Sequence, residues 1–161
     1  MRRIFAEFIT EKIKQDSTIH ILSIDFADYL FEKLNKESPG HYWNFGVTEQ
    51  ATIAIAAGMA QEGLKPYVFG ITPFALERPF EFIKLDVVEQ NTNVKIVGYW
   101  DYENDGVTHK TKDPEAVCNT LGIRCFSPKN ASETINMFNL SYKNNSPTFF
   151  NLTRCEDYNG F

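Results

Sequence analysis

Short apolar stretches that alternate with helical segments are the feature of this sequence that most constrains its fold. The apolar stretches are rich in β-branched and aromatic residues, and the segments between them repeat their apolar residues at helical spacing. We expect strands over residues 18–25, 41–46, 65–71, 93–100, 124–128 and 147–154, and helices over 2–15, 29–35, 48–62, 77–90, 114–121 and 131–144. This order predicts an α/β fold, an open, mostly parallel sheet with helices on both faces.

The length of the chain suits one such sheet with a full core. It has 161 residues, and no internal repeat, linker or low-complexity stretch divides it, so we expect a single domain over residues 1–161. Gly63 is expected to end the helix at 48–62 as a C-cap. In the last helix, Ile135, Phe138 and Leu140 are expected to point inward.

Charge and composition argue against several classes of function. The net charge is −5 and no run of lysine or arginine is present, so nucleic-acid and membrane-surface binding are poor candidates. The N-terminal stretch lacks the apolar segment of a signal peptide, and no run approaches the roughly 20 apolar residues of a membrane span. Cys118, Cys125 and Cys155 lack zinc-type spacing and suit structural thiols. We therefore expect a cytoplasmic protein with no metal ligands of its own.

Polar and aromatic residues that follow the strands supply the candidate site. In an open α/β sheet, ligands bind beyond the carboxyl ends of the strands, so residues at these positions share one rim. They are Asp25 after the first strand, Glu49 after the second, Thr72 and Phe74 after the third, residues 101–109 after the fourth and 127–130 after the fifth.

Glu49 stands in the first turn of a helix built mainly from small apolar residues. One interpretation is a surface carboxylate that interacts with the helix dipole. However, the rest of the helix has almost no polar face, so we expect it to be packed on most sides. A carboxylate at the start of a buried helix needs either a partner or a proton. The small residues also permit close approach of another backbone; they are Ala54, Ala56, Ala57, Gly58 and Ala60.

The stretch "FGVTEQATIAIAAGMAQEGLKPYV" (45–68) resembles the pyrimidine-binding domain of the transketolase family of thiamine diphosphate enzymes. The resemblance continues in "PFALERPFEFI" (73–83), "NTNVKIVG" (91–98), "NDGVTHKTKDPEAV" (104–117), "SPKNASE" (127–133) and "PTFFNLTR" (147–154). It covers roughly residues 4–154. Each segment alone is weak, but their occurrence in this order is specific.

The resemblance implies a set of cofactor-binding residues. The family's glutamate that matches Glu49 bonds the N1′ atom of the aminopyrimidine and helps form the imino tautomer that deprotonates the thiazolium carbon. Phe74 matches an aromatic residue that stacks on the aminopyrimidine, and Ile71 stands where many relatives have a second aromatic. Asp25 matches an aspartate that approaches the cofactor. The alternatives are a core side chain for Phe74 and a helix N-cap for Asp25.

The resemblance also implies substrate-binding residues after the fourth strand. His109 matches a histidine that contacts the sugar substrate, and we expect it to be catalytic together with Glu49. Asp105 matches an aspartate that recognises a substrate hydroxyl beside the reacting carbon. Lys110 replaces the family's usual glutamine and is included as a substrate contact, while Ser127 replaces a phosphate-binding arginine, with Lys129 close by. The alternative for His109 is a solvated loop residue.

One segment of the family is missing from this sequence. Relatives bind the diphosphate and Mg²⁺ through a separate domain with a Gly-Asp-Gly motif followed by an asparagine, and "NDG" at 104–106 is no substitute because it belongs to the pyrimidine-binding pattern. We likewise expect no counterpart of the C-terminal domain that usually follows in the family. We therefore expect a partner subunit that binds the diphosphate half of thiamine diphosphate and provides most of the Mg²⁺ site, in an α2β2 heterotetramer.

The function implied is that of one subunit of a split, transketolase-like transferase. Such an enzyme transfers a two-carbon ketol unit between a ketose and an aldose or sugar derivative, in carbohydrate metabolism. Two alternatives stay open: a β-like subunit of a 2-oxoacid dehydrogenase or decarboxylase, and a non-catalytic scaffold of a partner chain. The helix at 48–62 is the candidate for close subunit packing.

Overall fold

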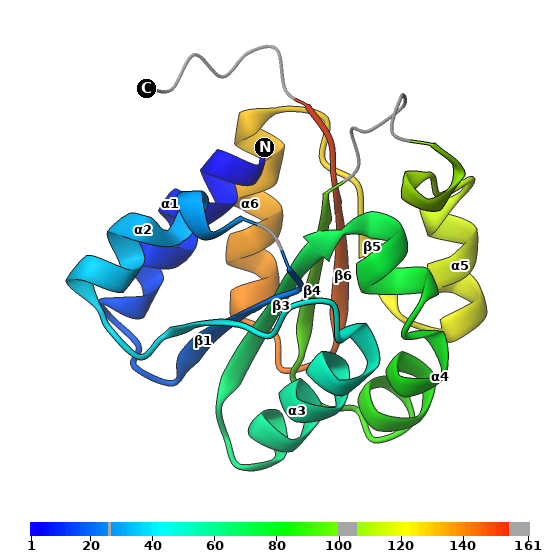
Figure 1. The fold of residues 1–161 in the computed structure, drawn as a ribbon, viewed down its shortest axis with the longest axis horizontal. Coiled ribbons are helices and arrows are strands. Elements are labelled where there is room, and N and C mark those ends of the chain that lie inside the picture. Colours follow the sequence, from blue (N-terminus) through cyan, green and yellow to red (C-terminus); the bar gives the residue numbers. More distant parts are fainter. Residues whose placement is uncertain (26, 100–105, 155–161) are drawn as a thin grey trace.

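Six parallel strands form one sheet in the computed structural model, which describes residues 1–25, 27–99 and 106–154. The strand order is β2-β1-β3-β4-β6-β5, and every pairing between neighbours is parallel. The strands are β1 (Ile19–Ser23), β2 (Tyr42–Asn44), β3 (Lys65–Ile71), β4 (Lys95–Tyr99), β5 (Arg124–Phe126) and β6 (Thr148–Leu152). The predicted α/β fold with a parallel sheet is confirmed (Figure 1).

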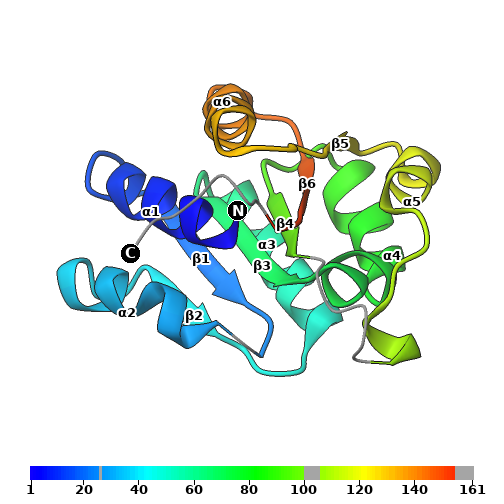
Figure 2. The ribbon, with the colours of Figure 1, turned by 90° about the horizontal axis from the view of Figure 1, so that it is seen from above.

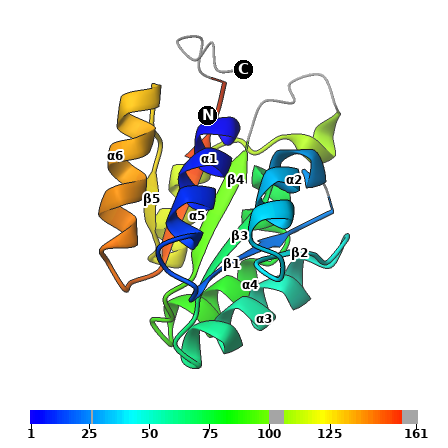
Figure 3. The ribbon, with the colours of Figure 1, turned by 90° about the vertical axis from the view of Figure 1, so that its left-hand side faces the viewer.

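Helices cover both faces of this sheet. The helices are α1 (Arg2–Ile13), α2 (Asp28–Glu37), α3 (Glu49–Gln61), α4 (Phe80–Phe82), α5 (Pro114–Leu121) and α6 (Ala131–Tyr142). Two π-helical turns, η1 (Pro73–Glu77) and η2 (Ile83–Val88), flank α4, and η3 (Val107–His109) is a 3₁₀ turn. Figures 2 and 3 show α1, α2 and α6 on one face, and Figure 2 shows α3, α4 and α5 on the other. Within the described residues, no helix is long and apolar enough to cross a membrane.

Strand side chains alternate between two separate cores. In β3, Phe69 faces the core under α1, α2 and α6, whereas its neighbour Val68 faces the core under α3, α4 and α5. Phe5 of α1 stacks on Phe69 with 5.5 Å between ring centroids and on Phe138 of α6 with 5.1 Å. A sheet buried on both faces needs apolar residues in consecutive positions, which explains the continuous apolar runs of the sequence.

Side-chain caps begin the two helices that follow the site-bearing loops. The Asp113 carboxylate accepts a hydrogen bond from the Ala116 N–H at 2.9 Å, which starts α5. Asn130 Oδ1 accepts one from the Glu133 N–H at 2.9 Å, and Asn130 Nδ2 donates to Glu133 Oε1 at 3.0 Å. The contacts from the Ala116 and Glu133 N–H groups satisfy helix donors that have no partner inside the helix. Asn130, predicted to line the rim, is thus used as a cap of α6.

The expectation about the inward face of α6 is wrong. Ile135 and Leu140 of α6 are 43% and 50% exposed, and only Phe138 of the three points inward. The buried face of α6 consists of Thr134, Phe138 and Ser141, which are spaced four and three residues apart, as one side of a helix requires.

Helix α3 leaves one stripe uncovered within this chain, and its expected packing on most sides, together with that against another subunit, stays a prediction. Ala51, Ile55 and Gly58 are exposed and form a stripe at the same spacing of four and three residues. Ile55 is 41% exposed. Gly63, with φ +85°, follows the helix as expected.

Two glycines at one level of the sheet allow η1 to lie against the strands. Gly70 of β3 and Gly98 of β4 are partners in the β3–β4 pairing. A Cβ atom on Gly98 would lie 2.8 Å from Thr72 Oγ1, and one on Gly70 would lie 3.5 Å from the Ala75 Cβ. Because neither glycine carries a side chain, the turn between Thr72 and Ala75 passes directly over both strands. Phe74 is held in this turn.

His20 gives the fold a predicted dependence on pH. It stacks on His41 with 4.9 Å between ring centroids, and its Nδ1 atom is buried with no hydrogen-bond partner in the described residues. Burial first, and the charge of His41 second, hold the pKa of His20 below the ordinary value of 6.5. The unfolded chain therefore takes up this proton at a higher pH than the folded chain.

We therefore expect the free energy of unfolding to fall as the pH drops from about 7.5 to about 5.5. The His20→Gln variant should show a flatter profile over this range, measured by urea unfolding at several pH values. The control is Lys33→Gln, which replaces an exposed cation on α2 and should leave the slope unchanged. Parallel profiles for the wild type and His20→Gln would contradict the prediction.

Candidate active site

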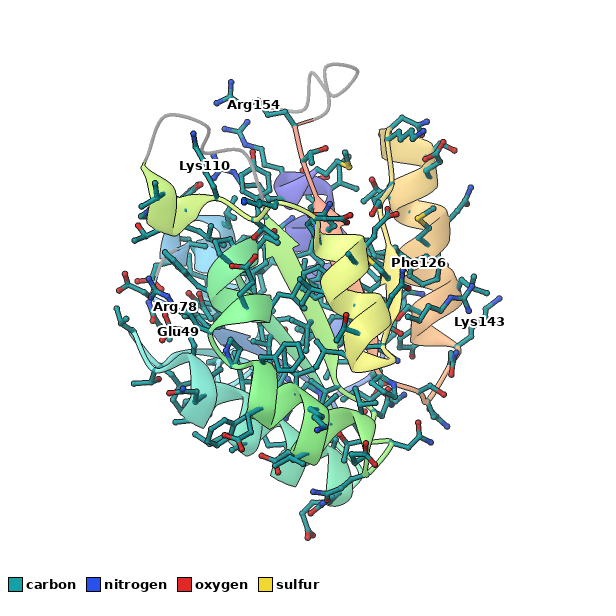
Figure 4. The ribbon with its side chains drawn as sticks, turned by 90° about the vertical axis from the view of Figure 1, so that its right-hand side faces the viewer. Glu49, Arg78, Lys110, Phe126, Lys143 and Arg154 are labelled. Carbon is teal, nitrogen blue, oxygen red and sulfur yellow. The ribbon has the colours of Figure 1, made fainter. Side chains whose placement is uncertain are left out.

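The Glu49 carboxylate lies at the start of α3 and is largely buried, with 8% of the residue exposed. Arg78 Nη1 donates a hydrogen bond to Glu49 Oε1 at 2.6 Å. Among the described residues, Oε2 of the same carboxylate has no hydrogen-bond partner. The expectation that Glu49 is buried and needs a partner is confirmed, and the partner is a guanidinium. Figure 4 shows the two side chains next to each other at the edge of the molecule.

The π-helical turn η1 brings Phe74 and Arg78 into contact. The Arg78 N–H donates to the Pro73 carbonyl, five residues back, at 3.1 Å, which is the hydrogen bond of a π turn. Arg78 Cζ lies 3.8 Å from the centroid of the Phe74 ring, the geometry of a close cation–π contact. One guanidinium therefore touches the carboxylate of α3 and the aromatic face presented by η1.

His109 joins this group from the loop after β4. Its ring lies 4.9 Å from the Phe74 ring, centroid to centroid, at an interplanar angle of 66°. The His109 Nδ1 atom lies 3.0 Å from Thr108 Oγ1. Glu49, Arg78, Phe74 and His109, which come from three separate segments of the chain, thus form one continuous set of contacts.

The remaining predicted residues lie outside this set. Asp25 is exposed at the end of β1 with φ +67°, and its carbonyl accepts a hydrogen bond from Asn44 Nδ2 at 2.9 Å. Its alternative role as a helix N-cap is wrong, because Ala27 holds that position in α2. Ile71 is 8% exposed at the end of β3, opposite Tyr99 of β4.

Two predicted substrate contacts have different outcomes. Lys110 is exposed and directly follows His109; Figure 4 shows it on the same side of the molecule as the Glu49–Arg78 pair. Asp105 lies outside the described residues. Lys129, the predicted neighbour of the rim, is exposed, and its backbone N–H donates to Glu133 Oε2 at 2.9 Å.

Arg78 is the member of this group that the sequence analysis missed. The segment "PFALERPFEFI" contains it, but no role was assigned to it. The available signal was the four-residue spacing between Phe74 and Arg78, since side chains four apart meet on one side of a helix.

Thr72 was named in the sequence analysis only as a rim residue. Its Oγ1 atom is buried and has no hydrogen-bond partner in the described part of the chain.

No cluster of three or more His, Cys, Asp or Glu side chains suited to a metal ion occurs in the described ranges. The chemistry of the group is that of one buried carboxylate, an aromatic face, an imidazole and a partly exposed cation. A carboxylate and an aromatic face together suit a planar ring that carries N–H donors.

Comparison with known proteins identifies the family. Residues 1–156 match the family described as "Transketolase, pyrimidine binding domain". One subunit of the apulose-4-phosphate transketolase of Phocaeicola vulgatus is 28% identical over 158 residues, which are 95% of this chain and 51% of that protein. The 6-deoxy-6-sulfo-D-fructose transketolase subunit SqwH of Clostridium sp. (strain MSTE9) is 26% identical over 159 residues, 96% of this chain and 49% of that protein.

A solved structure shares the fold along almost the whole chain. It is described as "Split gene transketolase, inactive beta4 tetramer", and it matches with a TM-score of 0.84 and 24% identity over 99% of this chain and 52% of its own. The present chain thus spans about half the length of these relatives. By the match over residues 1–156, the chain belongs to the transketolase pyrimidine-binding domain family.

Proposed function

We propose that this chain is a pyrimidine-binding domain over residues 1–161 and a subunit of a split, thiamine diphosphate-dependent transketolase-like enzyme. The observation that carries the proposal is the set of contacts that leads from the buried Glu49 carboxylate through Arg78 to the Phe74 ring, and from that ring to His109. Along the chain these residues follow β2, β3 and β4, whose carboxyl ends lie at one edge of the parallel sheet, where open α/β sheets bind ligands. Family membership and the names of the two transketolase subunits support the same assignment.

The side chains present fit the aminopyrimidine part of the cofactor. Glu49 offers a buried carboxylate to a ring nitrogen, Phe74 offers an aromatic face, and Ile71 offers an apolar wall at the end of β3. When bound, thiamine diphosphate supplies the carbon nucleophile that no amino-acid side chain provides. Glu49 would hold or move a proton at the N1′ position, and burial in a water-poor site strengthens that hydrogen bond.

His109 and its neighbours would act on the substrate. The edge-to-face contact between the His109 and Phe74 rings places the imidazole beside the proposed cofactor ring. A substrate bound next to that ring would therefore be within reach of His109. We propose that His109 binds and orients the sugar, that Lys110 attracts an anionic group on it, and that Asp105 and Asp25 complete the substrate and cofactor contacts. The two relatives are named for apulose 4-phosphate and 6-deoxy-6-sulfo-D-fructose, and a sugar with an anionic terminal group is accordingly the proposed substrate class.

The reaction we propose is transfer of a two-carbon ketol unit from a ketose to an aldose or sugar derivative. A separate diphosphate-binding subunit would hold the diphosphate and Mg²⁺, through the oxygen ligands that a hard cation prefers. An α2β2 assembly places two such sites around a two-fold axis. The free thiols of Cys118 and Cys125 suit a reducing cytoplasm.

Calorimetric titration tests this proposal. Thiamine diphosphate with Mg²⁺ is titrated into this chain alone, into a diphosphate-domain transketolase subunit from the same genome, and into the mixture. We expect tight binding in the mixture only, followed by turnover with a ketose donor. Turnover with a 2-oxoacid but no ketose would replace the reaction by that of a dehydrogenase or decarboxylase subunit. If the mixture binds no more cofactor than the separate chains do, the remaining function is that of a non-catalytic scaffold for the partner chain.

A further inference from the structure

Arg78 contacts both of the side chains that are proposed to hold the aminopyrimidine, Glu49 and Phe74. Its Nη1 donates to Glu49 Oε1 at 2.6 Å, and its Cζ lies 3.8 Å from the centroid of the Phe74 ring. The same planar group therefore makes an edge contact with the carboxylate and a face contact with the aromatic ring. A protonated aminopyrimidine would need the same two contacts: N–H donors at its edge and a flat face for stacking.

The two occupants exclude each other on geometric grounds. A ring stacked on this face of Phe74 needs the space that the guanidinium fills at 3.8 Å. A ligand could still bind Glu49 through Oε2, because Arg78 bonds only Oε1. The face of Phe74, however, can hold only one planar group at stacking distance, either the guanidinium or the ligand ring. A brace that merely oriented Glu49 would need only the carboxylate contact.

The Arg78 side chain is able to leave. Its side chain is 42% exposed, whereas that of Glu49 is 10% exposed. Arginine has a long flexible stem and stays charged in water. When the Arg78 side chain moves away from Glu49, its guanidinium is therefore hydrated rather than left buried without a partner. The carboxylate would then be without its donor until a ligand replaces it.

We propose that Arg78 is an internal occupant of the pyrimidine site, which holds Glu49 and Phe74 in place in the free subunit and is displaced when the aminopyrimidine binds. This inference rests on the proposed function, because it takes the ligand to be an aminopyrimidine. It makes Arg78 a determinant of cofactor affinity: part of the binding free energy is used to break its ion pair and its ring contact.

The first test observes the displacement directly in the wild-type chain. Protons on the Arg78 side chain lie over the Phe74 ring and should be shielded by its ring current. Thiamine, which carries the aminopyrimidine without the diphosphate, is titrated to millimolar concentration while these protons are followed by NMR. We expect their shielding to disappear as thiamine binds. Shielding that persists at saturation would overturn the proposal.

The second test compares affinities. The Arg78→Ala variant has no internal competitor, and we expect it to bind thiamine about tenfold more tightly than the wild type, a change of about 1.4 kcal/mol. Arg124→Ala is the matched control, because Arg124 Cζ lies 4.5 Å from the centroid of the Phe126 ring, in a cation–π contact away from the Glu49 site. It should bind thiamine with wild-type affinity.

A third variant separates displacement from an effect on folding. Arg78→Lys keeps a cation for Glu49 but loses the planar group that stacks on Phe74, so it should bind thiamine more tightly than the wild type and less tightly than Arg78→Ala. Weaker binding by both Arg78 variants would overturn the proposal and make Arg78 a brace for Glu49.

The failure of this inference is distinguishable from the failure of the proposed function. If the mixture with the diphosphate-domain subunit binds thiamine diphosphate and Arg78→Ala weakens that binding, the function stands and the displacement is wrong. If neither the wild-type mixture nor the Arg78→Ala mixture binds thiamine diphosphate, the proposed function is wrong and the displacement falls with it.

Discussion

Replacement of Glu49 by glutamine is expected to lower the turnover of the assembled enzyme by about 10²–10⁴-fold, the usual contribution of a positioned proton-transfer group. The amide has nearly the same shape as the carboxylate and can still accept a hydrogen bond from Arg78. However, it cannot hold or release a proton at the N1′ position of the cofactor. The loss should therefore appear in kcat with the partner subunit present, measured with a ketose donor at saturating thiamine diphosphate and Mg²⁺.

The matched control for this change is Glu62→Gln at the other end of the same helix. Glu62 is the exposed C-cap residue of α3, so its conversion to an amide should leave turnover and stability unchanged. Circular dichroism and thermal unfolding of both variants establish that each is folded. Full turnover by Glu49→Gln would contradict the catalytic assignment of this carboxylate.

Substitution of Gly98 by alanine is expected to destabilise the chain by about 1–3 kcal/mol, the range found when methyl groups are forced into packed cores. The new Cβ atom would lie 2.7 Å from Phe149 Cζ, 2.8 Å from Thr72 Oγ1 and 3.1 Å from Thr72 Cα. The last contact is with backbone, which a side-chain rotation cannot relieve. The turn that carries Phe74 must therefore move away from the sheet, so cofactor binding should weaken together with stability.

Gly58→Ala provides the opposite expectation from the same chemical change. Gly58 lies on the exposed side of α3, and a Cβ atom there would meet nothing within 4 Å. Alanine in a helix is favoured over glycine by roughly 0.5–1 kcal/mol, so this variant should be slightly more stable. Urea unfolding of both variants measures the two changes, and equal effects would contradict the argument from close packing.

The elements that the sequence predicted best are those bounded by local signals. The structure has β3 at Lys65–Ile71 and α5 at Pro114–Leu121, the residue ranges expected from sequence. The strand follows Gly63 closely and is apolar from Pro66 onward, and the helix lies between the Asp113 cap and a glycine. Such signals act within a few residues, so they can be read without knowing the rest of the fold.

The features that the sequence did not predict depend on tertiary packing. The Glu49–Arg78 ion pair joins residues that are 29 positions apart, and its formation depends on how α3 and η1 meet. The orientation of α6 likewise depends on the surface beneath it, which accepts Thr134 and Ser141 and leaves Ile135 and Leu140 in solvent. Periodicity names the possible faces of a helix, but contacts with other elements decide which of them is buried.

The candidate site was predicted in part. The buried position of Glu49 and the nearness of Phe74 to His109 agree with a rim formed by the carboxyl ends of parallel strands. The role of Arg78 could not be read from the sequence, because an arginine four residues after a phenylalanine is also common on exposed helix surfaces. The role of Arg78 depends on its contact with the Glu49 carboxylate, which belongs to a different helix, α3.

The π-helical turn at Pro73–Glu77 makes this edge of the molecule sensitive to the number of residues in the turn as well as to their type. A wider turn accommodates one more residue than an α-helical turn, and each residue of an α-helix advances about 100° around its axis. Loss of a single residue here would close the turn and rotate Phe74 relative to Arg78, even with both side chains retained. In an alignment of such chains, a one-residue gap at this place therefore marks a real difference in site geometry, and variants that alter the length of the turn are a different class of change from substitutions within it.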